Sequence, residues 1–348
     1  MTAEKALVVG ATGMVGTRLV EHLISDGWSV VGLCRKPPTD SNGIYYLSVD
    51  LLNVDECNKK LGGIHDVSHV FYAARAKHHE GAIEPVEENL AMLQNIVEVV
   101  SAASPALRHV HLVHGAKYYG SHLGRYKTPA KEDDPRHTPP NFYYDQQDFV
   151  AQHAGAWNWS ISRPALVYDY TPGRSRNPVS LIAAYAAISR ALGLPLDYPG
   201  SESSYKALVE GVAATHLASA IVWIATTESC VNEAFNVTNG DYFRWENIWP
   251  RIATYFQLPA GRPRRLSLSK IMSDKGGLWH RIVHQHKLVK TELVDLALWS
   301  FGDFMFGSSW DLCSSTTKLR DAGFTDIVDT ECMIFNLFDL YRSSKFIA

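Results

Sequence analysis

Several features that mark specialised classes of protein are missing from this sequence. The five cysteines are odd in number and none has CxxC spacing, so the sequence predicts neither a disulfide framework nor a metal site. No apolar run approaches the ~18 residues of a membrane span. A first strand that begins near residue 5 leaves no room for a signal peptide. We therefore expect a cytoplasmic protein with no membrane partner.

An excess of charge of either sign is missing as well. Lys and Arg number 33 against 36 Asp and Glu, which gives a net charge of −3 at pH 7. This balance produces no field that would attract nucleic acid, so no nucleic-acid partner is expected. The 348 residues with 46% hydrophobic content instead indicate a globular chain of one large domain, or a nucleotide domain with a second lobe. The sequence leaves a homodimer open.

A glycine-rich loop is the most informative segment that is present. Gly10, Gly13 and Gly16 lie between the apolar run 6–9 and an amphipathic segment, 17–26. A strand, a glycine turn and a helix in this order bind the pyrophosphate of a dinucleotide, because glycine lets the backbone approach it and the N–H groups at the helix start hold the phosphates. Thr12, Met14 and Val15 complete the predicted loop.

Apolar segments alternate with segments of helical periodicity along the first half of the chain. The predicted strands are residues 6–9, 29–34, 45–47, 69–72, 108–113 and 159–164, and the predicted helices between them are 17–26, 54–61, 85–102 and 142–154. Strands that alternate with helices predict an α/β fold with a doubly wound parallel sheet of Rossmann type.

The second half of the chain predicts a smaller, mostly helical substrate lobe. We expect residues 1–168 to form the dinucleotide-binding core and residues 169–348 to contain the lobe, mainly in 170–205 and 255–311, where short helical segments are rich in aromatic residues. Segments 206–254 and 312–348 are expected to return to the core.

The end of the second predicted strand indicates the choice of cofactor. A carboxylate at this position would bind the ribose 2′-OH of NAD, but the chain has Cys34, Arg35 and Lys36 there. Two cations can pair with a 2′-phosphate, so NADP is predicted. Ligands collect at the carboxyl ends of parallel strands, which adds further candidates at the same sheet edge. These candidates are Asp50 and Leu51 near the adenine, Ala73, Ala74, Arg75, His114, Pro164 and Val167.

The Tyr-x-x-x-Lys pair of short-chain dehydrogenases is absent from the helix where it belongs. The only such spacing is Tyr341 with Lys345 near the C-terminus, far in sequence from the sheet. The expected helix begins instead with NFYYDQQD at 141–148, which has Gln147 at the lysine position. A lysine is available at Lys117, in the run GAKYYG that follows the fifth predicted strand.

These two motifs resemble those of the progesterone 5β-reductase and iridoid synthase family, which are atypical short-chain dehydrogenases. The family has G-x-K-x-Y-x-G after that strand and N-F-Y-Y-x-x-E-D on the helix, and segments from the glycine loop to Trp245 follow its pattern over nearly the whole chain. Two departures are Gln147, where the family has glutamate, and His114, which replaces a small polar residue. Because of these two replacements, the family's range of substrates does not carry over directly to this chain.

The resemblance implies that Tyr143 is catalytic and that Lys117 is its partner, with Tyr144 and Tyr118 as neighbours at the substrate. Enzymes of this family reduce the C=C bond of an enone with NADPH, and the tyrosine hydroxyl then meets the negative charge on the carbonyl oxygen. The nearby lysine is expected to lower the pKa of the tyrosine.

The substrate implied by the resemblance is a steroid, a terpenoid or another enone of specialised metabolism. Aromatic residues of the second lobe, among them Trp279 and Phe304, are expected to form the walls of its pocket. A carbonyl reductase or dehydrogenase, a non-reductive cyclase and an NADP(H)-binding regulatory protein remain alternatives at this point.

Overall fold

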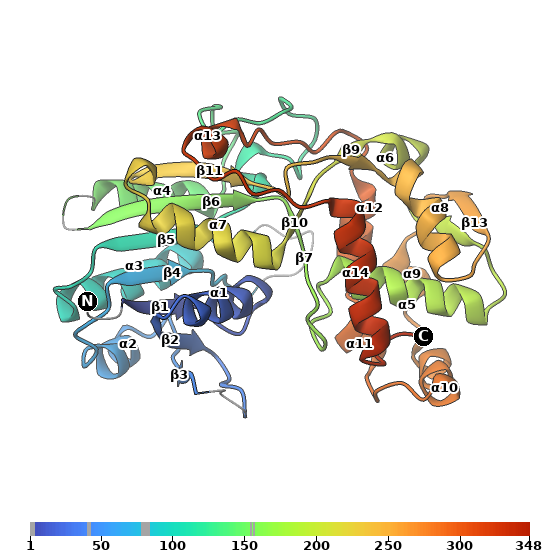
Figure 1. Ribbon diagram of the computed structural model, residues 1–348, viewed down its shortest axis with the longest axis horizontal. Coiled ribbons are helices and arrows are strands. Elements are labelled where there is room, and N and C mark those ends of the chain that lie inside the picture. The colour runs from blue at the N-terminus through green and yellow to red at the C-terminus, as the bar shows by residue number, and fades with distance from the viewer. Residues whose placement is uncertain (1–3, 40–42, 78–83, 154, 156) are drawn as a thin grey trace.

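A seven-stranded parallel sheet forms the centre of the larger lobe, on the left of Figure 1, in the order β11-β6-β5-β4-β1-β2-β3. The computed structural model describes residues 4–39, 43–77, 84–153, 155 and 157–348. The strands of the sheet are β1 (Lys5–Val9), β2 (Ser29–Cys34), β3 (Tyr45–Ser48), β4 (His69–Tyr72), β5 (His109–Val113), β6 (Asn158–Pro164) and β11 (Glu233–Val237). The predicted Rossmann-type sheet is confirmed.

Helices cover both faces of this sheet. One face is packed by α2 (Val54–Leu61), α3 (Val86–Ala103) and α4 (Phe142–Gln152), and the other by α1 (Met14–Ser25), α7 (Ala214–Thr226) and α13 (Thr317–Asp321). Each of the longer helices presents an apolar stripe, as α1 does with Leu19, Val20 and Leu23. Strands covered on both faces are mostly apolar, which explains continuous apolar runs such as residues 6–9.

From β1 the sheet is extended on one side by β2 and β3 and on the other by β4, β5 and β6, so the switch point of the topology lies at β1. Ligands of open parallel sheets bind outside the carboxyl ends of the strands at such a point. Gly10 follows β1 with φ 83°, and a Cβ there would lie 2.9 Å from the carbonyl oxygen of Ala73, which follows β4. Only glycine fits this close approach of two strand ends.

A second lobe, on the right of Figure 1, has its own apolar core around α5 (Pro178–Ala191), whose residues 178–189 are all buried. Its other helices are α6 (Glu202–Lys206), α8 (Trp245–Tyr255), α9 (Leu268–Ile271), α10 (Gly276–His286), α11 (Leu293–Leu296), α12 (Trp299–Gly307) and α14 (Thr330–Ser343). Short strands pair outside the main sheet: β7 (Leu166–Tyr168) with β10 (Gly211–Ala213), β8 (Leu196–Tyr198) with β13 (Ala260–Pro263), and β9 (Leu208–Val209) with β12 (Phe243–Arg244).

Two helices lie in a different core from the one that the sequence predicts. The expectation that 206–254 and 312–348 return to the sheet is wrong for α8 and α14, because Trp249 and Phe338 are buried in the core of the second lobe. Each helix has one apolar face, and such a face indicates burial but does not specify the partner. α14 packs against the almost completely buried α5, whereas α7 and β11 pack in the sheet region.

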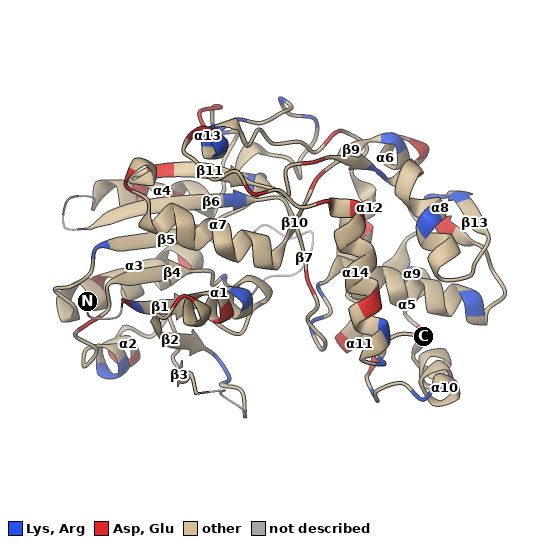
Figure 2. Ribbon diagram, viewed as in Figure 1, with Lys and Arg blue, Asp and Glu red and all other residues tan. Residues whose placement is uncertain are grey.

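Charged residues of both signs are distributed over both lobes (Figure 2), in agreement with the small net charge. Among the described residues, no helix has both the length and the apolar character needed to cross a bilayer.

Candidate active site

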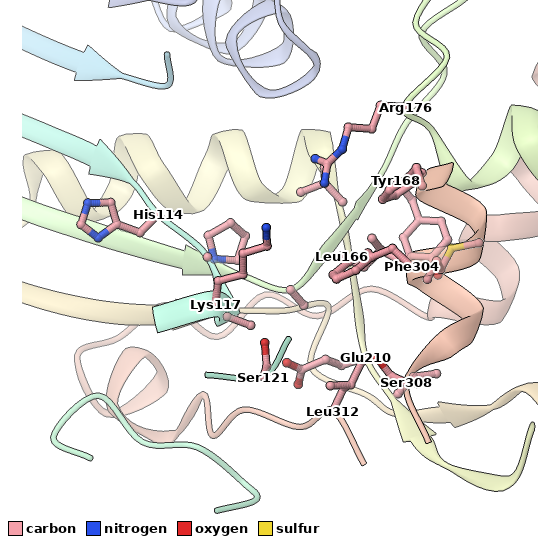
Figure 3. A pocket seen from close by; sticks show the side chains of 18 of the residues that line it. His114, Lys117, Ser121, Leu166, Tyr168, Arg176, Glu210, Phe304, Ser308 and Leu312 are labelled. Carbon is pink, nitrogen blue, oxygen red and sulfur yellow. The ribbon is translucent and has the colours of Figure 1, made fainter. Parts of the chain in front are cut away.

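A pocket of about 450 Å³ lies where the carboxyl ends of the sheet strands meet the second lobe (Figure 3). Its lining includes nine residues that the sequence analysis singled out: Met14, Val15, Arg75, His114, Lys117, Tyr143, Pro164, Val167 and Phe304. The second lobe adds apolar walls from Trp245, Phe301 and Met305. The predicted lysine and tyrosine therefore share one pocket with the first turn of α1.

Asn141 connects the lysine with the tyrosine. It is the N-cap of α4, and its Oδ1 accepts a hydrogen bond from the backbone N–H of Tyr143 at 3.1 Å. Its Nδ2 donates to the carbonyl oxygen of Lys117 at 3.0 Å, in the 3₁₀ turn η1 (Ala116–Tyr119). The buried side-chain amide of Asn141 thus caps α4 and also holds the start of this helix against the turn that contains Lys117.

Tyr143 packs against two rings and is 7% exposed. The imidazole of His114 stacks on it at 4.4 Å between centroids with an interplanar angle of 18°, and Phe142 lies at the same centroid distance. Burial keeps the pKa of His114 well below its ordinary value, so this imidazole is neutral. The histidine that departs from the family pattern is therefore an uncharged neighbour that stacks on the tyrosine ring.

The expected lowering of the pKa of Tyr143 is wrong. Burial, followed by the charge of Glu84, raises the pKa of this phenol well above its ordinary value, and Arg75 and Arg176 offset only part of the shift. Lys117 is itself paired with this carboxylate, because its Nζ lies 3.2 Å from Glu84 Oε1. The same carboxylate oxygen accepts from Arg75 Nη1 at 2.8 Å, so the charge of the lysine is shared.

The glycine loop ends at a helix start suited to an anion. The N-cap of α1 is Gly13, which makes no side-chain cap, and the first turn holds no acidic residue. A Cβ at Gly16 would lie 2.1 Å from the carbonyl oxygen of Gly10, so the helix packs directly against the turn. The carbonyl oxygen of Thr12 accepts from Arg174 Nη2 at 2.6 Å. This arrangement leaves the amides of the first turn available for phosphate.

The ends of β2 and β3 place the other predicted cofactor residues on the sheet edge. Cys34 is buried at the end of β2, and Arg35 and Lys36 directly after it are exposed. Asp50 is exposed and accepts from the backbone N–H of Leu52 at 3.1 Å, while the carbonyl oxygen of Leu51 accepts from Asn95 at 2.9 Å. The predicted contacts of these residues with the ribose, 2′-phosphate and adenine stay predictions.

Three residues assigned to the substrate lie outside the pocket lining. Tyr144 donates its hydroxyl to the carbonyl oxygen of Tyr118 at 2.7 Å, and the two rings pack edge to face in a small cluster beside the pocket. Trp279 is completely buried in the second lobe and donates to the carbonyl oxygen of Thr291 at 2.9 Å. Large aromatic side chains on an apolar helix face bury themselves whether or not a ligand is near, so the sequence pattern alone is misleading here.

Gln147 replaces the family glutamate next to a buried arginine. Its Oε1 accepts from Arg163 Nη2 at 3.0 Å, and the guanidinium of Arg163 is 1% exposed and lies 3.4 Å from the ring centroid of Tyr118. The substitution keeps the acceptor but removes a negative charge beneath the site.

Three charged pocket residues were missed by the sequence analysis. Arg174 and Arg176 lie in the loop after β7, and Glu210 lies between β9 and β10. The arginines follow a strand end, and Glu210 is the single charge in the apolar run 208–214, so each left a signal in the sequence.

Comparison with known proteins places this geometry in a family. Residues 42–347 match the model of the PRISE-like Rossmann-fold domain. The chain is 35% identical to an (S)-8-oxocitronellyl enol synthase of Antirrhinum majus and 31% identical to a 3-oxo-Delta(4,5)-steroid 5-beta-reductase of Arabidopsis thaliana. Each alignment covers 98% of this chain and 92% of the relative.

Solved structures of lower identity share the fold. The epimerase Mth375 of Methanothermobacter thermautotrophicus superposes with a TM-score of 0.70 at 16% identity, over 98% of this chain and 93% of that one. A short-chain dehydrogenase/reductase superfamily protein of Agrobacterium tumefaciens, with bound NAD, gives 0.68 at 14% identity, over 99% and 98%. The Rossmann architecture, the motifs and the full-length similarity agree: this chain belongs to the PRISE-like Rossmann-fold family.

Proposed function

We propose that this protein reduces the C=C bond of α,β-unsaturated carbonyl compounds with NADPH by 1,4-hydride addition. The observation that carries the proposal is that Lys117 and Tyr143 line one pocket together with the first turn of the glycine-loop helix. The relatives named as a steroid 5-beta-reductase and as enol synthases support it, because an enol is the species that hydride addition to an enone creates.

The residues present fit a dinucleotide with a 2′-phosphate. The uncapped N-terminus of α1 would hold the pyrophosphate, and the exposed cations of Arg35 and Lys36 would pair with the 2′-phosphate. When bound, the cofactor supplies the hydride. These contacts favour NADP over NAD, since NAD recognition places a carboxylate at this strand end.

The phenol of Tyr143 is suited to stabilise the charge that forms on the substrate. Addition at the β-carbon moves negative charge to the carbonyl oxygen, which then requires a hydrogen-bond donor. Because the pKa of Tyr143 is raised, its hydroxyl stays protonated at neutral pH and can donate. One such preorganised donor contributes about 2.7–4 kcal/mol of transition-state stabilisation. The ammonium of Lys117 lines the same pocket and adds a positive charge there, which is partly balanced by Glu84.

The same protonation state favours reduction over alcohol oxidation. Oxidation of an alcohol needs a base to remove the hydroxyl proton, and a phenol with a raised pKa is a poor base. The α-carbon would be protonated from solvent, so the reaction requires no dedicated acid. The apolar walls and the volume of about 450 Å³ suit a terpenoid or steroid skeleton.

The test is NADPH oxidation with progesterone and a panel of small enones. We expect wild-type turnover and a loss of about a hundredfold or more in kcat for Tyr143→Phe, with a smaller loss for Lys117→Met. Tyr144→Phe is the matched control, because its hydroxyl bonds the Tyr118 carbonyl outside the pocket and the variant should retain most of the activity. Equal turnover by Tyr143→Phe, Lys117→Met and wild type would disprove the assigned roles.

Other outcomes distinguish the remaining functions. Conversion of C=O in place of C=C would indicate a carbonyl reductase. Product formation without NADPH consumption would indicate a cyclase. Tight NADPH binding with no hydride transfer across the panel would indicate a regulatory protein.

A further inference from the structure

A buried carboxyl group in the pocket wall has no part in the proposed reaction. Glu210 lies between β9 and β10, is 5% exposed and lines the pocket. Its neighbours in sequence are Leu208, Val209, Gly211 and Val212. Placing an ionisable group in such surroundings destabilises the fold unless it is hydrogen-bonded, so its position calls for a reason.

Ser314 holds this carboxyl group in place. The backbone N–H of Ser314 donates to Oε2 at 2.7 Å and its hydroxyl donates to Oε1, also at 2.7 Å. Each carboxylate oxygen can accept two hydrogen bonds, so one acceptor position on each oxygen is still available for a ligand. The Ser314 pair fixes the side chain without using up its acceptors.

The electrostatic surroundings of Glu210 contain phenols and a thiol. The titratable groups that face it are Tyr126, Tyr242 and Cys313, and burial together with the charge of Glu210 raises the pKa of all three, so they are neutral at physiological pH. Burial raises the pKa of Glu210 itself to about 7, despite the bonds from Ser314.

The carboxyl group of Glu210 points toward the hydroxyl of Ser121 in Figure 3, where Lys117 lies between this pair and Arg176. Ser121 follows Gly120, which ends the lysine turn with φ 73°, and its carbonyl oxygen accepts from the indole of Trp310 at 3.1 Å. Two polar side chains thus face the same part of a mostly apolar pocket, and the one from Glu210 is held in place by Ser314.

We propose that Glu210 and Ser121 form a polar anchor that binds a hydroxyl group of the substrate, so that the preferred substrates are hydroxylated apolar enones. That the substrate is an enone rests on the proposed function, whereas binding of a hydroxyl group at Glu210 and Ser121 does not depend on it. A hydroxyl satisfies both side chains, since it donates to the carboxylate and accepts from Ser121. A substrate carboxylate would be repelled by Glu210.

The first experiment measures binding, so that it does not depend on turnover. Saturated steroids with and without a single hydroxyl group, at several ring positions, are titrated by calorimetry into the NADP-loaded protein. For at least one position we expect binding about ten- to hundredfold tighter than that of the parent steroid. Glu210→Leu should abolish this preference, and Glu210→Gln, which keeps an acceptor oxygen, should retain part of it.

Ser121→Ala tests the anchor independently, in case the Glu210 variants fold poorly. It removes one hydroxyl group but keeps the backbone carbonyl that accepts from Trp310, so the fold should not change. It should reduce the hydroxyl preference severalfold at an unchanged melting temperature. The preference in wild type should also strengthen as pH rises through about 7, as Glu210 ionises, and this dependence should vanish in Glu210→Gln. A purely structural Glu210 would produce no such pH dependence.

The outcomes separate the two proposals. Hydroxyl-selective binding without enone reduction supports the anchor and overturns the proposed function. Enone reduction with equal binding of hydroxylated and parent steroids supports the function and overturns the anchor. Selective binding of steroidal amines in place of alcohols would also overturn it, since it would indicate a cation site.

Discussion

The two lobes contribute different things to the pocket. The sheet region supplies polar groups at strand ends, such as Lys117, His114 and Arg75, whose positions are set by backbone geometry. The second lobe supplies mainly side-chain surface from Trp245, Phe301 and Met305. The polar groups of the pocket are therefore positioned by the backbone, whereas its shape depends on side-chain packing, which tolerates change more readily.

Glycine substitutions provide the strongest test of this difference. A Cβ at Gly16 in α1 would lie 2.1 Å from a backbone oxygen, whereas a Cβ at Gly302 in α12 would meet the tip of the Leu268 side chain at 2.8 Å. We expect Gly16→Ala to lower the free energy of unfolding by more than about 3 kcal/mol and to weaken NADPH binding at least about tenfold. Gly302→Ala should cost only about 1 kcal/mol, because leucine can rotate and alanine favours the helix.

Urea unfolding and NADPH titration of both variants measure these effects. Both glycines are inside helices, so the gain in helix propensity cancels between the two variants. Equal losses of stability would mean that the second lobe tolerates an added methyl group no better than the glycine loop does, which would contradict the proposed difference between the lobes.

The same difference explains what could be predicted from the sequence. Strand ends follow from alternating apolar runs, so Lys117 and Arg75 could be placed at the pocket from the sequence. Side-chain partners across the lobes do not follow from any local pattern. Trp279 was predicted to face the substrate and is in a core, and Glu210 faces the pocket and was not predicted.

The family motif was informative because it records a tertiary contact. Asn141 connects α4 with the turn that contains Lys117, and hydrophobic periodicity in the sequence does not show that these two segments are in contact. The pairing of Lys117 with Glu84 likewise joins segments that lie 33 residues apart in the sequence. The burial that raises the pKa of Tyr143 is also a tertiary property, so the sign of this shift could not be predicted from the sequence.

The joint between the lobes gives a second, smaller prediction. Arg18 of α1 donates from Nε to Asp169 Oδ1 at 2.9 Å and from Nη2 to the carbonyl oxygen of Tyr170 at 2.7 Å, just past β7. Asp169 is 3% exposed, and burial raises its pKa to about 6 although Arg18 lowers it. Arg18→Met should reduce the free energy of unfolding by about 2–3 kcal/mol at neutral pH, because it leaves a buried carboxylate unpaired.

The sign of the pH dependence identifies the cause of that loss. Without Arg18 the carboxyl of Asp169 binds a proton more readily in the folded state, so the loss should be larger at about pH 8 than at about pH 5. Arg18→Met/Asp169→Asn should recover part of the stability and lose this pH dependence. A loss that stays constant with pH would assign the effect to the packing of the arginine stem.

A buried histidine network distinguishes the sheet region from the second lobe. Among the described residues, the five buried histidines all lie in the sheet region: His69, His109, His111, His114 and His216. Ser160 Oγ lies 2.6 Å from His109 Nε2 and 2.8 Å from His111 Nδ1, and Ser162 Oγ lies 3.0 Å from His111 Nε2. Burial lowers the pKa of His109 to about 3 and holds that of His111 well below its ordinary value.

These histidines should make the sheet region sensitive to acid. The unfolded chain binds protons on histidine below about pH 6.5 and the folded chain does not, so stability falls as pH falls, by up to about 1.4 kcal/mol per pH unit for each histidine. His111→Gln keeps an amide that can bond the serines but removes one titrating group. Urea unfolding at about pH 7.5 and 5.5 should therefore show a smaller loss of stability for His111→Gln than for wild type, by about 1.4 kcal/mol between these two pH values. Parallel curves for the two proteins would show that the network does not give the sheet region its expected acid sensitivity.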